Sequence, residues 1–160
     1  MIKRVLQCLA TTGLIFVIVA APATAQVKWS VGAGMTQPTT SGADNGFHGL
    51  GAAGFSFPGS PVSIRIDGMF HSFSNFSMIG VNGDAVYGFA PGPVSPYILG
   101  GASWASSKVD GVSGSATDFG FNVGGGINFG LGALKLFAEA RYMKLGDGDA
   151  LIPMTMGIHF

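Results

Sequence analysis

Charged residues and cysteine are scarce in this chain of 160 residues. Lys, Arg, Asp and Glu together make up 10% of it, against about 25% in ordinary soluble domains, which excludes a helical bundle with a charged surface. There is one cysteine, whereas glycine occurs 27 times. A chain of this length forms one domain, with room for a single core or a single closed sheet.

A basic stripe is also missing. Lys3 and Arg4 lie at the N-terminus, and the chain after residue 25 has six basic and eight acidic residues, a net charge of −2. A nucleic-acid-binding surface needs clustered positive charge. We therefore expect no nucleic-acid partner.

The first 25 residues have the three parts of a secretory signal peptide. Basic Met1–Arg4 is followed by an apolar stretch that ends in Leu14–Ala21, and then by the small residues Ala23–Ala25. Polar residues interrupt the apolar stretch, so it is shorter than the ~20 residues of a membrane anchor. We predict that residues 1–25 are cleaved after export by the general secretory route, and that residues 26–160 form the mature domain.

Beyond residue 26, apolar and polar residues alternate with the period of two that is typical of strands. The alternation is plainest in Thr117–Phe129, and it recurs in Val62–His71, Ala133–Tyr142 and the last ten residues. Apolar residues do not recur at the i, i+3, i+4, i+7 spacing of a helix face, because glycine interrupts the pattern too often. Together with weaker segments, the pattern predicts eight strands, over residues 27–36, 47–57, 62–73, 77–89, 95–105, 117–129, 133–144 and 151–160.

The connections between these strands are predicted to alternate in length. Tight turns are expected at 58–61, 90–94 and 130–132, longer polar loops at 37–46 and 105–116, and shorter ones near 74–76 and 146–150. Short turns on one rim and longer loops on the other are typical of outer-membrane barrels. The predicted fold is all-β: an eight-stranded antiparallel up-and-down transmembrane β-barrel.

The charges indicate which face of each strand points into the barrel. Among strand residues only Lys144 has the parity of the apolar face, and it lies at the loop-side rim, where its stem can snorkel. A face without charge is expected to meet lipid, since a charge there costs about 2–4 kcal/mol at mid-depth. The interior of such a barrel is just wide enough for side chains to fill, so we predict an ion-pair network that plugs the lumen. Its predicted members are Lys28, Arg65, Asp67, Asp84, Asp118, Lys135, Glu139 and Arg141.

Aromatic residues on the apolar faces of the predicted strands are placed to form two girdles. Phe47–Phe57 and Phe119–Phe129 each span a height of about 25 Å at a tilt near ~40°, the height of an outer-membrane apolar band. The predicted girdle residues are Trp29, Phe47, Phe57, Phe70, Tyr87, Phe89, Phe119, Phe129 and Tyr142, with Phe160 beside them. The alternative is a soluble barrel or sandwich in which these aromatic residues form the core.

Four segments resemble a known family: "PYILGGASW" (96–104), "TDFGFNVGGGINFGLG" (117–132), "LFAEARYMKL" (136–145) and "LIPMTMGIHF" (151–160). The chain resembles the small outer-membrane β-barrel proteins of the opacity-protein and outer-membrane-protein-A-like class. The resemblance implies a monomer in the bacterial outer membrane with lipids as partners. It also implies that the terminal Phe160 is the signal read by the barrel-assembly machinery.

Three classes of function remain open. The first is a structural or surface-exposed barrel, and the second is a narrow channel or small-solute conduit. The third is a lipid hydrolase with a site at the barrel rim, for which His71 and Ser72 are the candidate pair. These two residues have opposite parity, and spacing places no carboxylate to orient the histidine. We therefore assign no catalytic residue and expect a protein that is not an enzyme.

No metal or cofactor site is predicted. His48, His71 and His159 are expected in different strands and at different depths, so a shared metal is not expected. Cys8 would leave with the signal peptide. The glycines of residues 120–130 lie within a strand with no helix after it, which excludes a phosphate-binding loop. They are expected to thin the inward face, so that long side chains can fill the lumen.

Overall fold

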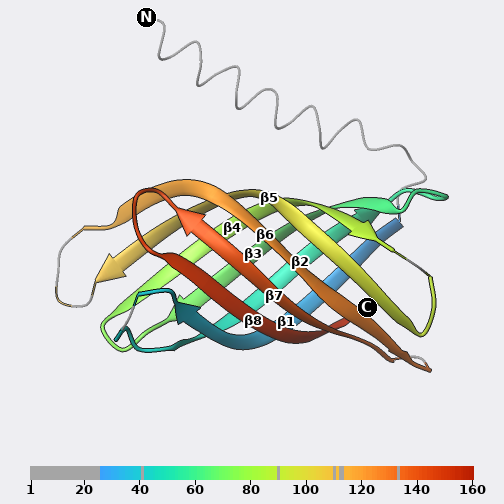
Figure 1. Ribbon diagram of the computed structural model, residues 1–160, viewed down its shortest axis with the longest axis horizontal. Helices are drawn as coiled ribbons and strands as arrows, with labels where there is room; N and C mark the ends of the chain where they lie inside the picture. The colour runs from blue at the N-terminus through green and yellow to red at the C-terminus, as the bar shows by residue number, and fades with distance from the viewer. Residues whose placement is uncertain (1–25, 41, 90, 110, 112–113, 133) are drawn as a thin grey trace, which may run out of the picture.

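The computed structural model describes residues 26–40, 42–89, 91–109, 111, 114–132 and 134–160, so the predicted signal peptide lies outside the described residues. The strands are β1 (Gln26–Pro38), β2 (Gly46–Ser56), β3 (Val62–Ser72), β4 (Phe76–Gly88), β5 (Val94–Val109), β6 (Ala116–Leu131), β7 (Leu134–Leu145) and β8 (Ala150–His159). Each strand pairs antiparallel with the next, and β8 pairs with β1, which closes the barrel (Figure 1). The predicted eight-stranded up-and-down barrel is confirmed.

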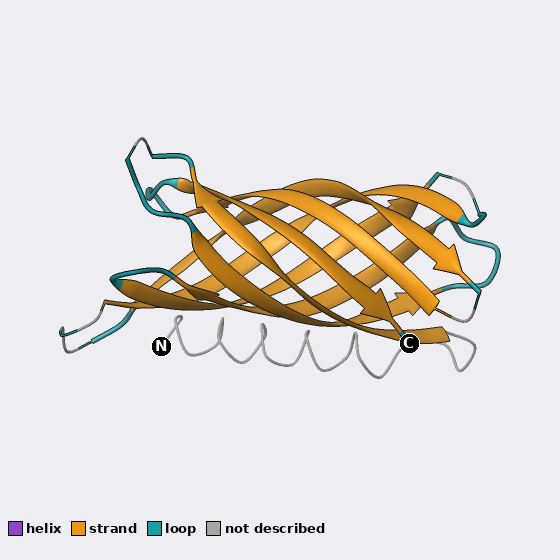
Figure 2. Ribbon diagram, turned by 90° about the horizontal axis from the view of Figure 1, so that it is seen from below, coloured by secondary structure: helices purple, strands orange, loops and turns teal. Residues whose placement is uncertain are grey.

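In the part of the chain that the structure describes, strands account for all the regular structure (Figure 2). In the described residues, no helix is long and apolar enough to cross a membrane.

The two ends of the barrel are formed by different connections. Residues 57–61, 89–93 and 132–133 join strands at one end, which we call the turn rim; residues 39–45, 73–75, 110–115 and 146–149 join them at the other, the loop rim. Gly59 adopts a φ of 76° in its turn, a left-handed conformation that glycine reaches without steric cost. The difference in length between the rims is smaller than predicted, because the β1–β2 and β5–β6 connections are shorter than the loops predicted at 37–46 and 105–116.

Strand β5 reaches further toward the loop rim than predicted, and β6 reaches further toward the turn rim, where Gly130 and Leu131 belong to the strand and not to the turn predicted at 130–132. Each has 16 residues, and Ala105–Val109 pair with Phe76–Gly80 of β4. The prediction of a loop over residues 105–116 was therefore wrong, and the connection is confined to residues 110–115. The polar run Ser106–Lys108 lacks the alternation required by a lipid-facing strand, but its backbone can still continue the hydrogen-bond ladder with β4.

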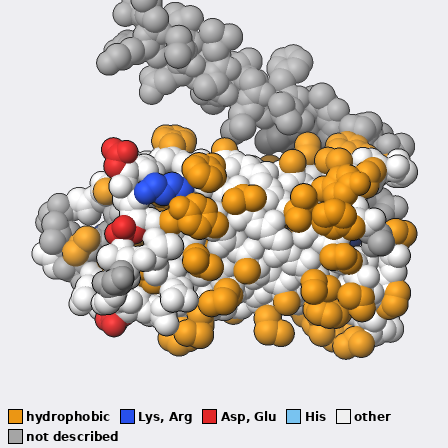
Figure 3. All heavy atoms as spheres, viewed as in Figure 1, with side chains coloured by type: hydrophobic (Ala, Val, Ile, Leu, Met, Phe, Trp, Pro, Cys, Tyr) orange, Lys and Arg blue, Asp and Glu red, His pale blue; other side chains and the backbone are white. Residues whose placement is uncertain are grey.

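The polar face of each strand points inward and the apolar face points outward. Along β3, Ile64, Ile66 and Phe70 are exposed, whereas Arg65 and Asp67 between them are buried. In the space-filling view, apolar side chains are spread over the barrel wall and are densest toward the turn rim, whereas the clearly visible charged ones gather at the loop rim (Figure 3). This orientation is that of a barrel with lipid outside, as predicted from the charges.

The predicted girdle residues lie on the outer surface, with one exception. Their exposed fractions run from 36% for Phe129 to 75% for Phe119, and Phe160 is 68% exposed. Phe57 is half-buried and follows the last residue of β2. Since Phe57 begins a turn, the alternation of the strand no longer sets the direction of its side chain.

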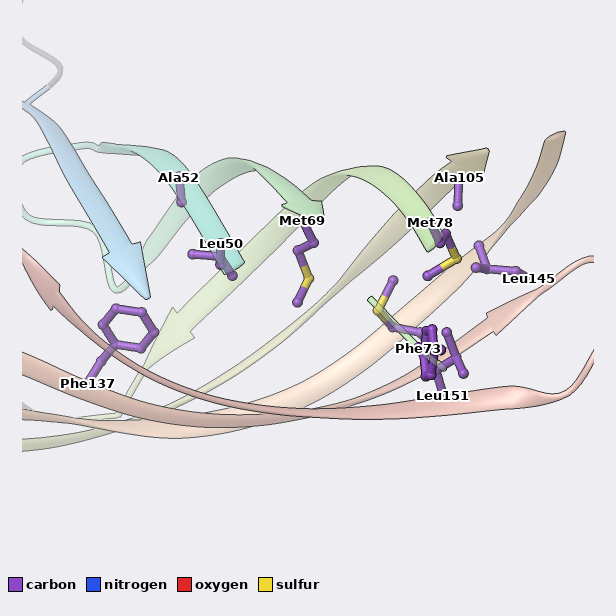
Figure 4. Close-up of a cluster of buried hydrophobic side chains, with 10 residues drawn as sticks. Leu50, Ala52, Met69, Phe73, Met78, Ala105, Phe137, Leu145 and Leu151 are labelled. Carbon is purple, nitrogen blue, oxygen red and sulfur yellow. The ribbon is translucent and has the colours of Figure 1, made fainter. Parts of the chain in front are cut away.

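Apolar side chains also fill part of the lumen. Phe73 and Phe76 stack at the loop rim with ring centroids 4.3 Å apart, and Met69 and Met143 are each 1% exposed. The buried apolar cluster is drawn in Figure 4. The barrel therefore has an apolar layer inside it in addition to its polar network.

Candidate functional site in the lumen

Five charged side chains meet inside the barrel, and we call them the lumen cluster. They come from β3, β4 and β7, and their exposed fractions lie between 1% and 8%. They are Arg65, Asp67, Asp84, Glu139 and Arg141. All five were among the residues predicted to form the network.

Arg141 contacts all three acidic residues of the lumen cluster. Its Nη2 donates to Asp67 Oδ2 over 2.7 Å, and its Nη1 donates to Asp84 Oδ2 over 3.2 Å. Its Nε donates to Glu139 Oε1 over 2.6 Å. The side chain has no exposed surface, so its charge is balanced by these carboxylates and not by water.

Arg65 approaches the same carboxylates from the opposite wall. Its two terminal nitrogens donate to the two oxygens of Glu139 over 2.8 and 3.1 Å, the bidentate geometry in which Arg–carboxylate pairs are strongest. Its Nε lies 3.3 Å from Asp67 Oδ2 without the geometry of a hydrogen bond. Because β3 and β7 are four strands apart in a ring of eight, the Arg65–Glu139 pair crosses the lumen.

Neutral side chains complete the coordination of the carboxylates. Tyr97 donates its hydroxyl proton to Glu139 over 2.7 Å, and Asn82 donates to Asp67 over 2.7 Å. Asn122 donates to Asp84 over 2.8 Å and also contacts Ser103. The sequence prediction did not include these four neutral residues. Their inward parity was the available signal, but it is shared with many residues that make no such contact.

Three predicted members lie outside the lumen cluster. Lys28, Asp118 and Lys135 are exposed, and the ion pairs among the described residues involve none of them. They have inward parity, but they are located near the ends of their strands. The prediction used parity alone, whereas depth along the barrel axis also decides which charges meet.

Glycines on β6 make room for the long side chains of the lumen. A Cβ atom at Gly126 would lie 2.6 Å from Tyr97 Oη, and one at Gly124 would lie 3.0 Å from Arg141 Cγ. The inward face of β6 is thin where Tyr97 and Arg141 pass over it. These contacts agree with the predicted use of glycine in this strand.

A second buried polar group lies between the lumen cluster and the loop rim. Thr36 Oγ1 is 2.9 Å from His48 Nδ1 and 2.8 Å from His71 Nδ1, and His48 Nε2 is 2.8 Å from Thr155 Oγ1. His48 and His71 are direct partners across β2 and β3, with ring centroids 5.3 Å apart. The expectation that these two histidines lie at different depths was therefore wrong, because the register of the strands places them side by side.

The candidate hydrolase pair is not assembled. The His71 side chain is buried in the lumen, where it bonds to Thr36, whereas Ser72 is exposed on the opposite face of β3. His159 lies at the turn rim, with Nδ1 2.7 Å from Ser30 Oγ and Nε2 2.9 Å from Asn128 Oδ1. Within the described ranges, no three His, Cys, Asp or Glu side chains are grouped so as to hold a metal ion.

A closed eight-stranded barrel with an apolar exterior and a polar, charge-bearing lumen defines an integral outer-membrane β-barrel protein. The family model described as "Outer membrane protein beta-barrel domain" matches residues 9–156, and the chain belongs to this family. The bacterial outer membrane is accordingly its location.

Solved structures show the same fold. Neisserial surface protein A (NspA) matches with a TM-score of 0.72 and 19% identity, over 84% of this chain and 97% of that one. The N-terminal β-barrel domain of Pseudomonas aeruginosa OprF matches with a TM-score of 0.64 and 16% identity, over 85% and 99%. Ail, the attachment invasion locus protein of Yersinia pestis, matches with a TM-score of 0.58 and 18% identity, over 84% and 97%. A search of curated protein sequences gives no match.

Proposed function

We propose that this protein is a structural, surface-exposed barrel whose lumen is plugged by the lumen cluster, and that it is not an enzyme. The observation that carries the proposal is the Arg65–Glu139 pair, which joins opposite walls of the barrel through two hydrogen bonds. Arg141 fills the space beside it with no exposed surface.

The physical reason for a plug is the cost of separating these charges. Breaking one partner out of a buried ion pair costs about 3–5 kcal/mol, because the remaining charge is left uncompensated. An ion that crosses the lumen has to displace Arg65 or Arg141 from carboxylates on three strands. We therefore expect a closed lumen at rest.

Biogenesis and partners form part of the same proposal. Residues 1–25 direct export by the general secretory route, and the barrel then inserts as a monomer with membrane lipids as its surroundings. The assembly machinery reads Phe160, whose side chain is 68% exposed and whose backbone pairs with Trp29 in both directions over 2.9 Å. The contact with Trp29 is part of the β1–β8 closure.

Planar-bilayer recording tests the plug. We expect no stepwise conductance from the wild-type protein, and we expect conductance from a variant in which Arg65→Ala and Glu139→Ala remove the cross-lumen pair together. The matched control changes Lys108→Ala and Asp147→Ala, two exposed charges at the loop rim, and is expected to stay closed. Regular conductance steps from the wild-type protein would contradict the proposal.

A narrow conduit is the second candidate, and one observation favours it. Buried polar atoms without a hydrogen-bond partner occur at several depths of the lumen: Arg65 Nε, His71 Nε2, Asn82 Oδ1 and Asn122 Oδ1. Such atoms are places where water can bind in a polar interior. If the same bilayer recording shows conductance steps from the wild-type protein and none from the Asn82→Leu variant, the protein is a narrow conduit and its lumen is not plugged.

The absence of enzymatic activity has its own test. The exposed Ser72 and the buried His71 face opposite sides of β3, so we expect lipid A to be unchanged after expression in a host whose lipid A is intact. Mass spectrometry of the extracted lipid A gives the answer. Loss of an acyl chain that is prevented by His71→Ala would show a hydrolase.

A further inference from the structure

Two adjoining cavities open at the turn rim of the lumen. One has a volume of about 180 Å³ and the other of about 210 Å³, and each is far larger than the about 10–15 Å³ that one water molecule requires. Lys28, Asn128 and His159 line both cavities, and Lys135 lines the second. We call the two cavities together the turn-rim vestibule.

The charges that line the vestibule are all positive. Lys28 and Lys135 contribute ammonium groups from β1 and β7, and Arg65 is the only member of the lumen cluster on its wall. Neither cavity is lined by an Asp or Glu, and the ion pairs of the described residues involve neither ammonium group. An entering anion therefore meets the two ammonium groups of the vestibule before it reaches the lumen cluster, where Arg65 is already paired with Glu139.

The parity of the two lysines directs them into the lumen and away from the lipid. Lys28 shares its strand face with the buried Ser30, and Lys135 shares its face with the buried Phe137. Short turns of outer-membrane barrels face the periplasm. The ammonium groups therefore face periplasmic water inside the barrel mouth and not the phosphates of the surrounding lipid.

A hydrogen-bond chain across the vestibule leaves an amide donor available. Asn128 Oδ1 can only accept, so His159 Nε2 carries the proton of their 2.9 Å contact, and His159 Nδ1 accepts from the Ser30 hydroxyl. No hydrogen bond within the described part of the chain uses the Asn128 side-chain N–H groups. They are available to donate to a ligand between the two lysines.

We propose that the turn-rim vestibule binds a small phosphate-type oxyanion from the periplasm. The ammonium groups of Lys28 and Lys135 and the side-chain amide of Asn128 donate hydrogen bonds to it, with the Arg65 guanidinium behind them. Charge-assisted hydrogen bonds of this kind are about twice as strong as neutral ones. The site does not depend on whether the lumen conducts, since the anion enters and leaves by the turn rim.

Titration with inorganic phosphate tests the proposal. The protein is folded in maltoside micelles, which carry no phosphate, and amide NMR signals are followed while chloride holds the ionic strength constant. We expect saturable shifts at Asn128 and His159, and at Ser95, which lines the second cavity. Changing Lys28→Gln and Lys135→Gln together is expected to raise the midpoint at least about tenfold, since a hydrogen bond to a charged group contributes a decade or more in affinity.

The matched control changes Lys108→Gln and Lys144→Gln, which removes the same charge from the loop rim, and its midpoint is expected to stay at the wild-type value. Faster migration of the unheated than of the boiled protein in an SDS gel verifies that both double variants are folded. Equal midpoints in the two double variants, or shifts that do not saturate, would overturn the proposal. Micelles doped with phosphatidylglycerol form the second arm, and shifts at the vestibule with this lipid alone would also overturn it by identifying a lipid headgroup as the ligand.

Discussion

Arg141 is the residue on which the lumen cluster depends most directly. It is 2% exposed and donates hydrogen bonds to Asp67, Asp84 and Glu139. The cluster has three carboxylates and two guanidinium groups, so loss of Arg141 leaves three carboxylates with a single cation. A neutral residue at this position is therefore more disruptive than one at a carboxylate.

We expect Arg141→Leu to lower the free energy of unfolding by about 3–5 kcal/mol, the cost of leaving a buried charge without its partner. Urea titration of the protein in lipid vesicles measures this change. Lys108→Leu, an exposed substitution at the loop rim, is expected to change the same quantity by less than about 0.5 kcal/mol. Equal effects of the two substitutions would show that the cluster does not stabilise the barrel.

Gly126 gives a second prediction at the scale of a residue. A Cβ atom there would lie 2.5 Å from the Ala138 carbonyl oxygen and 2.6 Å from Tyr97 Oη, so Gly126→Ala has to shift the β7 backbone as well as Tyr97. We expect a loss of about 1–3 kcal/mol, the usual cost of overpacking. Gly83→Ala is the control, because nothing lies within 4 Å of its Cβ position. Urea unfolding measures the free energy of unfolding of both variants. A Gly126→Ala protein as stable as the control would disprove the close packing at Gly126.

At the residue scale, the face that a side chain occupies follows from the sequence, but its partners do not. Period-two alternation assigned Arg65 and Glu139 to the inward face, and the structure places them there. It also assigned Lys28 and Lys135 to the network, although they face the vestibule. Alternation reports which face a residue occupies, but it carries no information on which strands stand opposite one another or at what depth.

At the scale of an element, side chains alternate in polarity where a strand crosses the lipid and need not alternate beyond it. Inside the apolar band every strand alternates, because one face meets lipid and the other meets the lumen. Beyond it, Ala105–Val109 of β5 continue to pair with β4 without any alternation. Hydropathy therefore predicted the membrane-spanning part of β5 and missed its extension.

The depth dependence of lipid contact predicts how the strands tolerate charge. Ala140 faces outward near the middle of β7, and Ser72 faces outward at the loop-rim end of β3. We expect Ala140→Arg to cost about 2–4 kcal/mol and Ser72→Arg about 0–1 kcal/mol, because the cost of a charge falls from the bilayer midplane to the interface. Unfolding in vesicles measures both, and a reversed order would place the membrane elsewhere on the barrel.

At the scale of the whole molecule, closure of the barrel leaves the sheet without a free edge. The β1–β8 pairing runs from Ser30 with His159 to Pro38 with Leu151, and backbone bonds between Trp29 and Phe160 extend it. Closure lets every strand pair its backbone with a neighbour on both sides, which is the condition for spanning a membrane with strands.

Closure predicts heat-modifiable migration. We expect the unheated protein to migrate faster in an SDS gel than the boiled protein, and to be recovered from the outer-membrane fraction, because a sheet without edges resists detergent. The boiled sample is the unfolded reference on the same gel. A periplasmic protein that migrates identically under both treatments would show that the barrel is soluble.

The sequence by itself determined the number of strands, their order and the side of each strand that faces lipid. The reason is that every strand needs apolar side chains on the face that meets lipid, and this requirement appears in the sequence as a local alternation. Only the tertiary structure decided which inward side chains meet. The Arg65–Glu139 contact spans 74 positions in the sequence, and the His48–His71 pair depends on strand register. Such contacts follow from the closure and tilt of the barrel, which no local pattern records.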